Sequence, residues 1–300
     1  MAEITRKRTG ELLRALFDIL MPLPEGLRAN KALEMLAGKV TLTAYESGNY
    51  PSGNRRFEKI VRFATVDCVK AGWLQKEDGT WTITDEGREA YKQYADPEAF
   101  YRRATKLYAQ WRSAQPDATP VAQAAATDTE AVDEVKEVAV TFEAARDQAR
   151  DEIDRHLEAM PPMDFQQLVA DLLGAMDWHV SWIAPPGKDG GIDIVAWPDP
   201  LGTKLPRIKV QVKRQQATIT VDGLRSFMAL LGDDDVGLFV SLGGFTKDAQ
   251  TEARTQAKRR VTLIDSSRLL DLWQQHYAKL SEAAQARLPL RPIYFLAPKA

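Results

Sequence analysis

Residues 187–197 read GKDGGIDIVAW, and residues 207–214 read RIKVQVKR. Both runs are rich in β-branched apolar residues, and this composition predicts two consecutive strands. The Gly190-Gly191 pair predicts a turn just ahead of the first strand, and Asp193 then interrupts the apolar run with a carboxylate. These two strands decide the fold, because they belong to the central sheet that we predict for the second half of the chain.

The second strand carries two polar side chains at a spacing that brings them together. Gln211 and Lys213 are two residues apart, so both project from one face of the strand, while Val210 and Val212 fill the other face. A charged lysine inside an apolar strand is costly to bury without partners. If the two strands form a hairpin, Asp193, Gln211 and Lys213 converge at one edge of a sheet.

The sequence around these strands alternates between helical and strand patterns. The expected helices have apolar residues at three- and four-residue spacing, and the expected strands are short apolar runs. This alternation predicts an α/β core with a mixed central sheet flanked by helices. Helices are expected at residues 143–160, 164–176, 221–231, 246–258 and 267–277, and further strands at residues 178–184, 236–242 and 261–266.

The first part of the chain has a different pattern. Three helical patterns, at residues 8–23, 26–40 and 54–72, precede a predicted β-hairpin. The hairpin turns at Asp78-Gly79, and Asp85 is expected to cap a following helix. Three helices followed by a hairpin is the order of a winged helix, so an α+β winged-helix domain is predicted to precede the α/β core.

Positive charge is concentrated on the third predicted helix and the hairpin after it. Residues 54–76 contain six basic and two acidic side chains. A DNA-binding winged helix places its third helix in the major groove, where local Lys and Arg clusters neutralise phosphates. The alternative is a solvated helix face on a module that docks protein. The residues predicted to bind DNA are Arg55, Arg56, Lys59 and Arg62.

The segment between the two patterned regions is acidic and rich in Ala and Thr. Residues 115–141 contain six acidic residues and a single basic residue, Lys136. This composition is typical of a linker, and the alternative is a solvated helix packed on one domain. The predicted domains are a winged helix at 1–112, a linker at 113–142, the α/β core at 143–285 and a tail at 286–300.

The bulk composition limits the class of protein. The 300 residues are 44% hydrophobic and 27% charged, which suits two globular domains, and the net charge is −2. Cys68 is the single cysteine, so an internal disulfide framework is excluded. Neither an apolar run long enough to cross a membrane nor the apolar core of a signal peptide is present. We therefore expect a soluble, cytoplasmic protein without a membrane partner.

The predicted cluster of Asp193, Gln211 and Lys213 suits metal-assisted hydrolysis of a phosphodiester. In such a site a carboxylate holds Mg²⁺ or Mn²⁺, and the metal polarises the phosphate and activates water. We predict Asp193 and Gln211 as the metal ligands, and Lys213 as the residue that positions water and stabilises developing charge. The alternative is a structural ion pair between neighbouring strands.

These residues and motifs carry a family resemblance. Residues 164–277 resemble the nuclease domain of Mrr-type restriction endonucleases, within the PD-(D/E)xK superfamily, and the N-terminal region is similar to that family's winged-helix domain. The resemblance implies a restriction endonuclease that cuts double-stranded DNA, often methylated DNA, with a divalent metal. The family's catalytic aspartate falls on Asp193, and its Gln-x-Lys pair falls on Gln211 and Lys213. The quoted matches are DFQQLVADLLGAMDW, GKDGGIDIVA, IKVQVKR, VGLFVSLGGFTKDA and VTLIDSSRLLDL, with YPSGNRRFEKIVRFATVDCVKAGWL and GTWTITDEGRE in the N-terminal region.

One position departs from the family pattern. The family commonly has an acid after Phe in the first core helix, where this chain has Gln166, so Gln166 is a further candidate catalytic residue. Asp164 is expected to be an N-cap, and the alternative is that its carboxylate replaces the missing acid in the metal site. Asp189 is expected to form the glycine turn, and Thr246 either caps a helix or, with Gly244, opens its N-terminus to a phosphate.

Two other functions remain as alternatives. One is a non-cleaving DNA-binding or regulatory protein that keeps a degenerate nuclease scaffold, and the other is an RNA or structure-specific nuclease. Cutting both strands with one site per chain favours a homodimer or a higher homo-oligomer.

Overall fold

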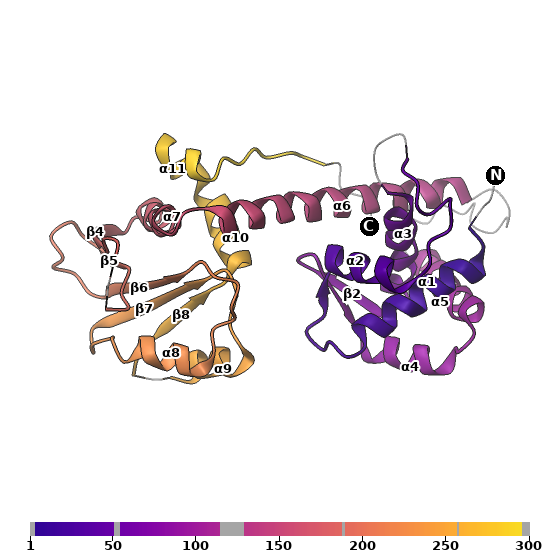
Figure 1. Cartoon of the computed structure of the whole chain (residues 1–300), viewed down its shortest axis with the longest axis horizontal. Coiled ribbons are helices and arrows are strands. Elements are labelled where there is room, and N and C mark those ends of the chain that lie inside the picture. The colour runs from indigo at the N-terminus through magenta and orange to yellow at the C-terminus, as the bar shows by residue number, and fades with distance from the viewer. Residues whose placement is uncertain (1–3, 51–54, 115–128, 188–189, 257, 296–300) are drawn as a thin grey trace. The chain divides into compact units, whose positions relative to one another are not determined.

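The computed structural model describes residues 4–50, 55–114, 129–187, 190–256 and 258–295 (Figure 1). The chain divides into two compact units. The boundary between them lies at Ala149 and Arg150, inside helix α6 (Thr129–Ala159). Phe295 is grouped with the first unit, where its ring lies 5.3 Å from that of Phe142.

The first unit contains the three helices and the hairpin that the sequence predicts. The Asp78-Gly79 turn is confirmed, and both residues have positive φ angles, 47° and 76°, as a tight hairpin turn requires. The strands form an antiparallel sheet in the order β1-β3-β2. The elements are α1 (Arg6–Leu20), β1 (Leu27–Arg28), α2 (Ala29–Lys39), α3 (Arg56–Lys70), β2 (Leu74–Glu77), β3 (Thr80–Ile83), α4 (Asp85–Gln93) and α5 (Pro97–Ser113).

Three features of this unit differ from the expectation. Strand β1 has only two residues, too few for a sequence pattern, and α5 was not predicted. Asp85 is the first residue of α4 rather than its cap, because the hydroxyl of Thr84 accepts the hydrogen bond from the backbone N–H of Gly87. Helix α5 contributes Phe100, which is fully buried in the core of the unit.

Helix α6 replaces part of the predicted linker. Residues 115–128 lie outside the described part of the chain, but the helix already begins at Thr129. Two of its acidic side chains, Glu143 and Asp147, bind basic residues of the first unit. The first unit therefore extends to Ala149, beyond the boundary expected from composition, because long-range ion pairs attach this segment to it.

The second unit is built on a five-stranded sheet in the order β4-β5-β6-β7-β8. The sheet is mixed, as predicted. The strands β4, β5 and β6 pair antiparallel, whereas β6, β7 and β8 pair parallel. The order leaves β4 and β8 at the two edges. The strands are β4 (His179–Ile183), β5 (Ile194–Trp197), β6 (Arg207–Lys213), β7 (Asp235–Ser241) and β8 (Val261–Ile264).

Helices cover both faces of this sheet, with α8 and α9 on the face opposite α7 and α10 (Figure 1). Val210 and Val240 belong to the hydrophobic core that α7 and α10 share with one face of the sheet, and Phe239 belongs to the core beneath α8 and α9. Leu288, in the predicted tail, is buried in the first of these cores. The helices are α7 (Pro162–Ala175), α8 (Val221–Met228), α9 (Lys247–Thr255), α10 (Ser266–His276) and α11 (Glu282–Arg287), with a 3-10 turn at Tyr277–Lys279.

An ion-pair cluster fixes the register at the start of β6 and β7. Arg207 and Lys209 bind the carboxylate of Asp235 at 2.6 and 2.9 Å. Burial alone would raise the pKa of Asp235, but the hydrogen bonds from Arg207 and Lys209 hold this pKa down to about 2. The opposite ends of the same two strands are thereby aligned, so that Lys213 lies beside Ser241. Among the described residues, no helix has the length and apolar character needed to cross a bilayer.

Candidate functional site

Asp193 lies immediately before β5, rather than inside the strand as the sequence suggests. It is 8% exposed, and two hydrogen bonds attach it to β6. Its backbone N–H donates to the carbonyl of Val210 at 2.8 Å, and its Oδ2 accepts from the backbone N–H of Val212 at 2.7 Å. These contacts flank Gln211, so Asp193 and Gln211 lie side by side on neighbouring strands, as the hairpin hypothesis requires.

The glycine turn ahead of Asp193 allows a close approach to Gln211. Gly190 and Gly191 have φ angles of 63° and 86°, which side-chain-bearing residues rarely adopt. A Cβ atom on Gly191 would lie 2.8 Å from Cδ1 of Leu230 and 3.5 Å from Nε2 of Gln211. The amide of Gln211 therefore lies against the turn that leads into Asp193.

Gln211 and Lys213 share the face of β6 that the two-residue spacing predicts. Val210 is fully buried in the core on the other face, and Val212 packs against the same core. Lys213, the last residue of β6, is exposed. The alternative hypothesis, a structural ion pair between neighbouring strands, would require a buried lysine. Lys213 is instead exposed at the end of the strand and is accessible to a substrate.

Gln166 supports Asp193 from behind. Its side chain is 6% exposed, and Nε2 donates to the backbone carbonyls of Asp193 at 2.9 Å and of Ala184 at 3.1 Å. Only a donor can face two carbonyl oxygens, so an amide fits here and a carboxylate does not. Asp164 is exposed and is not the N-cap, because α7 begins at Pro162 with Pro161 at the cap position.

We predict that Gln166→Glu destabilises the second unit. The substitution places a carboxylate against two buried carbonyl oxygens and removes the amide donor from both, although the carbonyl of Asp193 keeps its hydrogen bond from the backbone N–H of Ala184. Losing partners for buried groups lowers the free energy of unfolding by about 1–3 kcal/mol. Thermal unfolding of the full chain measures this loss. Gln274→Glu adds the same charge at an exposed position of α10 and serves as the control. Equal Tm values for the two variants would contradict the supporting role of Gln166.

The donors at this site are the oxygen ligands that Mg²⁺ prefers. Asp193 offers a carboxylate, and Gln211 beside it offers an amide oxygen. Among the described residues, no group of three or more His, Cys, Asp or Glu side chains can hold a metal. Mg²⁺ is commonly held by one or two carboxylates together with substrate phosphates, so this donor set fits a site that the substrate completes. Asp189 lies outside the described residues.

Ser241 is a neighbour of the site that sequence reasoning missed. It pairs in register with Lys213 and is completely buried. Its Oγ has no hydrogen-bond partner within the described ranges. A serine at the end of an apolar strand gives no signal in the sequence. Thr246 caps α9 by accepting from the backbone N–H of Ala249, so the N-cap interpretation of Thr246 is confirmed.

Three of the four predicted DNA-binding residues lie near or at the surface of α3. Arg55 is exposed, and its side chain lies 3.6 Å from Glu58. The guanidinium of Arg56 lies 4.6 Å from the ring centre of Tyr45. The ammonium of Lys59 lies 4.8 Å from the ring centre of Tyr50.

Arg62 differs from the other three, because it is 2% exposed and inaccessible to a phosphate in this structure. Its guanidinium binds Glu143 and Asp147 of α6 and Asn30 of α2. The positive charge expected on the surface at this position is instead neutralised by α6.

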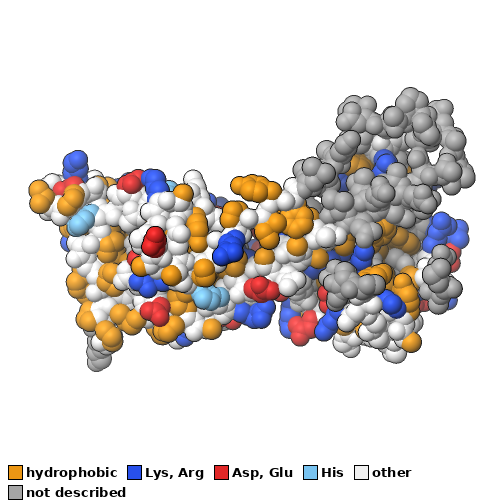
Figure 2. Space-filling model, turned by 90° about the horizontal axis from the view of Figure 1, so that it is seen from above, with side chains coloured by type: hydrophobic (Ala, Val, Ile, Leu, Met, Phe, Trp, Pro, Cys, Tyr) orange, Lys and Arg blue, Asp and Glu red, His pale blue; other side chains and the backbone are white. Residues whose placement is uncertain are grey.

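On the face seen in Figure 2, Lys and Arg side chains are interspersed with Asp and Glu rather than gathered in one block.

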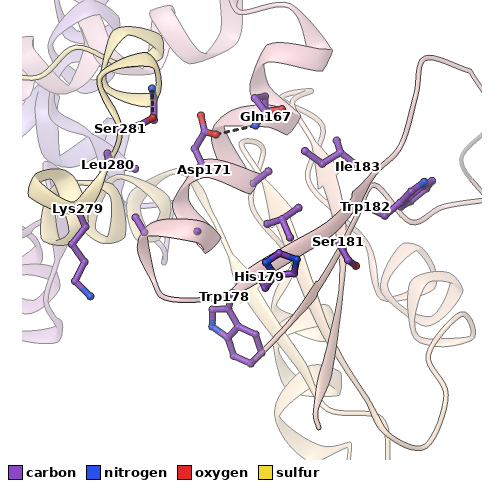
Figure 3. A pocket seen from close by; sticks show the side chains of 15 residues that line it. Gln167, Asp171, Trp178, His179, Ser181, Trp182, Ile183, Lys279, Leu280 and Ser281 are labelled. Carbon is purple, nitrogen blue, oxygen red and sulfur yellow. Dashed lines mark hydrogen bonds between the residues drawn. The ribbon is translucent and has the colours of Figure 1, made fainter. Parts of the chain in front are cut away.

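A pocket of about 560 Å³ lies elsewhere in the second unit, beside α7 and the edge strand β4. Trp178, His179 and Trp182 line this pocket (Figure 3). Gln167 and Asp171, one turn apart on α7, also line it and are joined by a hydrogen bond. Asp193, Gln211 and Lys213 are not among its lining residues. The candidate site at the end of the inner strands β5 and β6 is therefore separate from this pocket.

Comparisons with known proteins agree with the two-unit architecture. Residues 157–273 match the family model described as "Restriction endonuclease", and residues 10–93 match the one described as "Mrr N-terminal domain". A solved structure of the MspJI restriction endonuclease in complex with a 27-mer oligonucleotide is similar, with 16% identity and a TM-score of 0.32. That match covers 58% of this chain and 39% of the MspJI chain. The search of curated proteins gave no match.

Proposed function

The chain belongs to the Mrr family of restriction endonucleases, and we propose that it cuts double-stranded DNA by metal-dependent hydrolysis at Asp193, Gln211 and Lys213. The observation that carries this proposal is the pair of hydrogen bonds from Asp193 to the residues on either side of Gln211. They hold Asp193 beside Gln211, at the end of the hairpin β5-β6 where Lys213 is the last residue of β6.

Each residue has a distinct role in the proposed reaction. Asp193 and Gln211 would hold Mg²⁺ or Mn²⁺, which when bound polarises the scissile phosphate and lowers the pKa of a water. Lys213 would position the attacking water and stabilise charge that develops on the phosphate. Gln166 would keep the backbone of Asp193 in place through its two hydrogen bonds.

The first unit would supply DNA binding. Its third helix carries Arg55, Arg56 and Lys59 at or near the surface, where they can contact phosphates. We further propose that the substrate is modified, methylated DNA, as in restriction of foreign DNA. Because each chain carries one site, cleavage of both strands favours a homodimer.

A plasmid digest tests this function. Methylated and unmethylated plasmids are incubated with the full chain and Mg²⁺ or Mn²⁺, beside a chelator control. We expect cleavage of the methylated plasmid with either metal and none with the chelator. Equal cutting of both plasmids would contradict the preference for modified DNA, and cutting in the presence of chelator would contradict the metal requirement.

A second candidate is a non-cleaving DNA-binding protein with a degenerate nuclease scaffold. The observation that favours it is Gln166, which takes the place of an acid and uses its amide for support. This candidate predicts DNA binding without cleavage in every arm of the digest. The family's restriction activity and the Asp193–Gln211 pairing favour the nuclease.

A further inference from the structure

A cluster of buried charges joins helix α6 to the predicted DNA-binding region of the first unit. Nη1 of Arg62 lies 3.0 Å from Oε1 of Glu143 and 2.8 Å from Oδ2 of Asp147. Nζ of Lys76 lies 2.7 Å from Oε2 of Glu143. The four side chains are 3–13% exposed, so these ion pairs are largely shielded from water.

Three further groups complete the environment of the two carboxylates, and one of them is charged: Nε of Arg146 lies 3.9 Å from Oδ1 of Asp147. Nε1 of Trp81, on β3, donates to Oε1 of Glu143 at 3.0 Å. Oδ1 of Asp147 lies 3.0 Å from the position that a Cβ atom would occupy on Gly79, in the hairpin turn. Helix α6 therefore places its acids over both α3 and the hairpin, the two elements through which a winged helix contacts DNA.

The buried cluster lies at one end of a row of basic residues that begins at Arg55, the N-cap of α3, and continues along the helix. Arg55, Lys59 and Arg62 are spaced at i, i+4 and i+7, so they lie along one side of the helix. At one end of this row Arg55 is exposed, and at the other Arg62 is buried beneath the acids of α6. Helix α6 thus covers one end of a continuous basic row.

The donors around Glu143 and Asp147 are those that recognise a phosphate. Guanidinium and ammonium groups bind both carboxylate and phosphate oxygens, and an indole N–H can donate a hydrogen bond to either. Burial is unfavourable for some of these charges, because it lowers the pKa of Lys76 and raises that of Asp147. A buried ion pair contributes little net stability where the cost of removing both charges from water offsets their attraction. Exchange of these carboxylates for phosphates is therefore chemically reasonable.

We propose that Arg62, Lys76 and Trp81 form a phosphate-binding surface for duplex DNA, and that Glu143 and Asp147 occupy it until α6 is released. The inference rests on the proposed DNA-binding function of the first unit. In this arrangement the protein binds DNA weakly through Arg55, Arg56 and Lys59. Release of α6 adds the covered donors and tightens binding.

The test measures DNA affinity with Glu143→Gln/Asp147→Asn. These substitutions keep the size of each side chain and remove its charge. The full chain carries Asp193→Asn in addition, so that no DNA is cut, and binding of a fluorescein-labelled duplex is followed by anisotropy in Ca²⁺. We expect binding at least tenfold tighter than in the Asp193→Asn parent. Two newly available cations should also steepen the slope of log K against log salt by about 1.8, at roughly 0.9 for each phosphate neutralised.

Two controls separate the covered surface from a general charge effect. Asp151→Asn/Glu152→Gln removes the same charge from the same helix, four or more residues beyond Asp147, and should leave affinity unchanged. Adding Arg62→Gln to the test variant should abolish most of the gain. Thermal melts confirm that each variant is folded.

The outcomes distinguish this inference from the proposed function. Equal affinity and equal salt slope in parent and test variant would overturn the inference alone, provided the wild-type chain cuts plasmid. An equal gain in the Asp151→Asn/Glu152→Gln control would also overturn it, because the effect would then be one of net charge. Absence of duplex binding by every form would overturn both.

Discussion

Replacement of Asp193 by Asn should abolish cleavage while leaving the fold intact. The substitution removes the carboxylate charge but keeps an oxygen that can accept the hydrogen bond from Val212. Loss of one electrostatic donor typically lowers a rate by about 10²–10³-fold, and loss of a charged metal ligand should exceed this. Single-turnover cleavage of plasmid, with thermal melts in parallel, measures both effects.

The matched control is Asp233→Asn, which removes one charge from an exposed position of the same unit. It should cut DNA at the rate of the parent. The parent should gain thermal stability on addition of Mg²⁺ or Mn²⁺, because a ligand that binds only the folded state stabilises it. The Asn variant should show a smaller gain. A cleavage rate within tenfold of the parent would refute the catalytic assignment of Asp193.

The core of the site could be predicted because it depends on local regularities. Two-residue alternation places Gln211 and Lys213 on one face of any strand, and a buried apolar partner such as Val210 decides which face. The positive φ angles at Gly190 and Gly191 explain why glycines precede Asp193. These features require only neighbours in the sequence, so a pattern can reveal them.

The partners of Arg62 and Gln166 could not be predicted, because they are far away along the chain. Arg62 binds Glu143, 81 residues away, and the same basic residue would be exposed if α6 were not packed there. Gln166 binds the backbone of Asp193, 27 residues away, and a backbone acceptor leaves no mark in the sequence. In both cases the residue type is visible in the sequence, whereas its environment comes from tertiary structure.

The acidic segment was misread in part for a related reason. Its composition lacks aromatic residues and resembles a linker, yet from Thr129 onward it is helical. Ala and Glu favour helix intrinsically, and the ion pairs of Glu143 and Asp147 with the first unit supply the tertiary contacts that a polar helix needs. Glu143 and Asp147 lie just beyond the acidic segment, so the composition of that segment alone could not reveal the contacts that attach the helix.

Lys213→Met should slow cleavage without destabilising the protein. Lys213 is exposed at the end of β6, so loss of its charge should change the free energy of unfolding by no more than about 0.5 kcal/mol, as for other surface positions. If it instead compensated a buried Asp193, its removal would lower stability by roughly 3–5 kcal/mol. The exposure of Lys213 favours the first outcome.

The effect on rate should be large, because the ammonium group acts mainly in the transition state. Loss of one such stabilising donor raises the barrier by about 2.7–4 kcal/mol, which corresponds to a roughly 10²–10³-fold slower reaction. Single-turnover rates, with melts in the presence and absence of metal, separate rate from stability. Lys204→Met, at an exposed position of the same unit, is the control and should behave as the parent. Lys213→Arg keeps the charge with a different geometry. If charge stabilisation dominates, this variant should cut DNA faster than Lys213→Met. If positioning of water dominates, the two variants should cut at similar rates. A large loss of Tm with an unchanged rate would instead assign Lys213 a structural role.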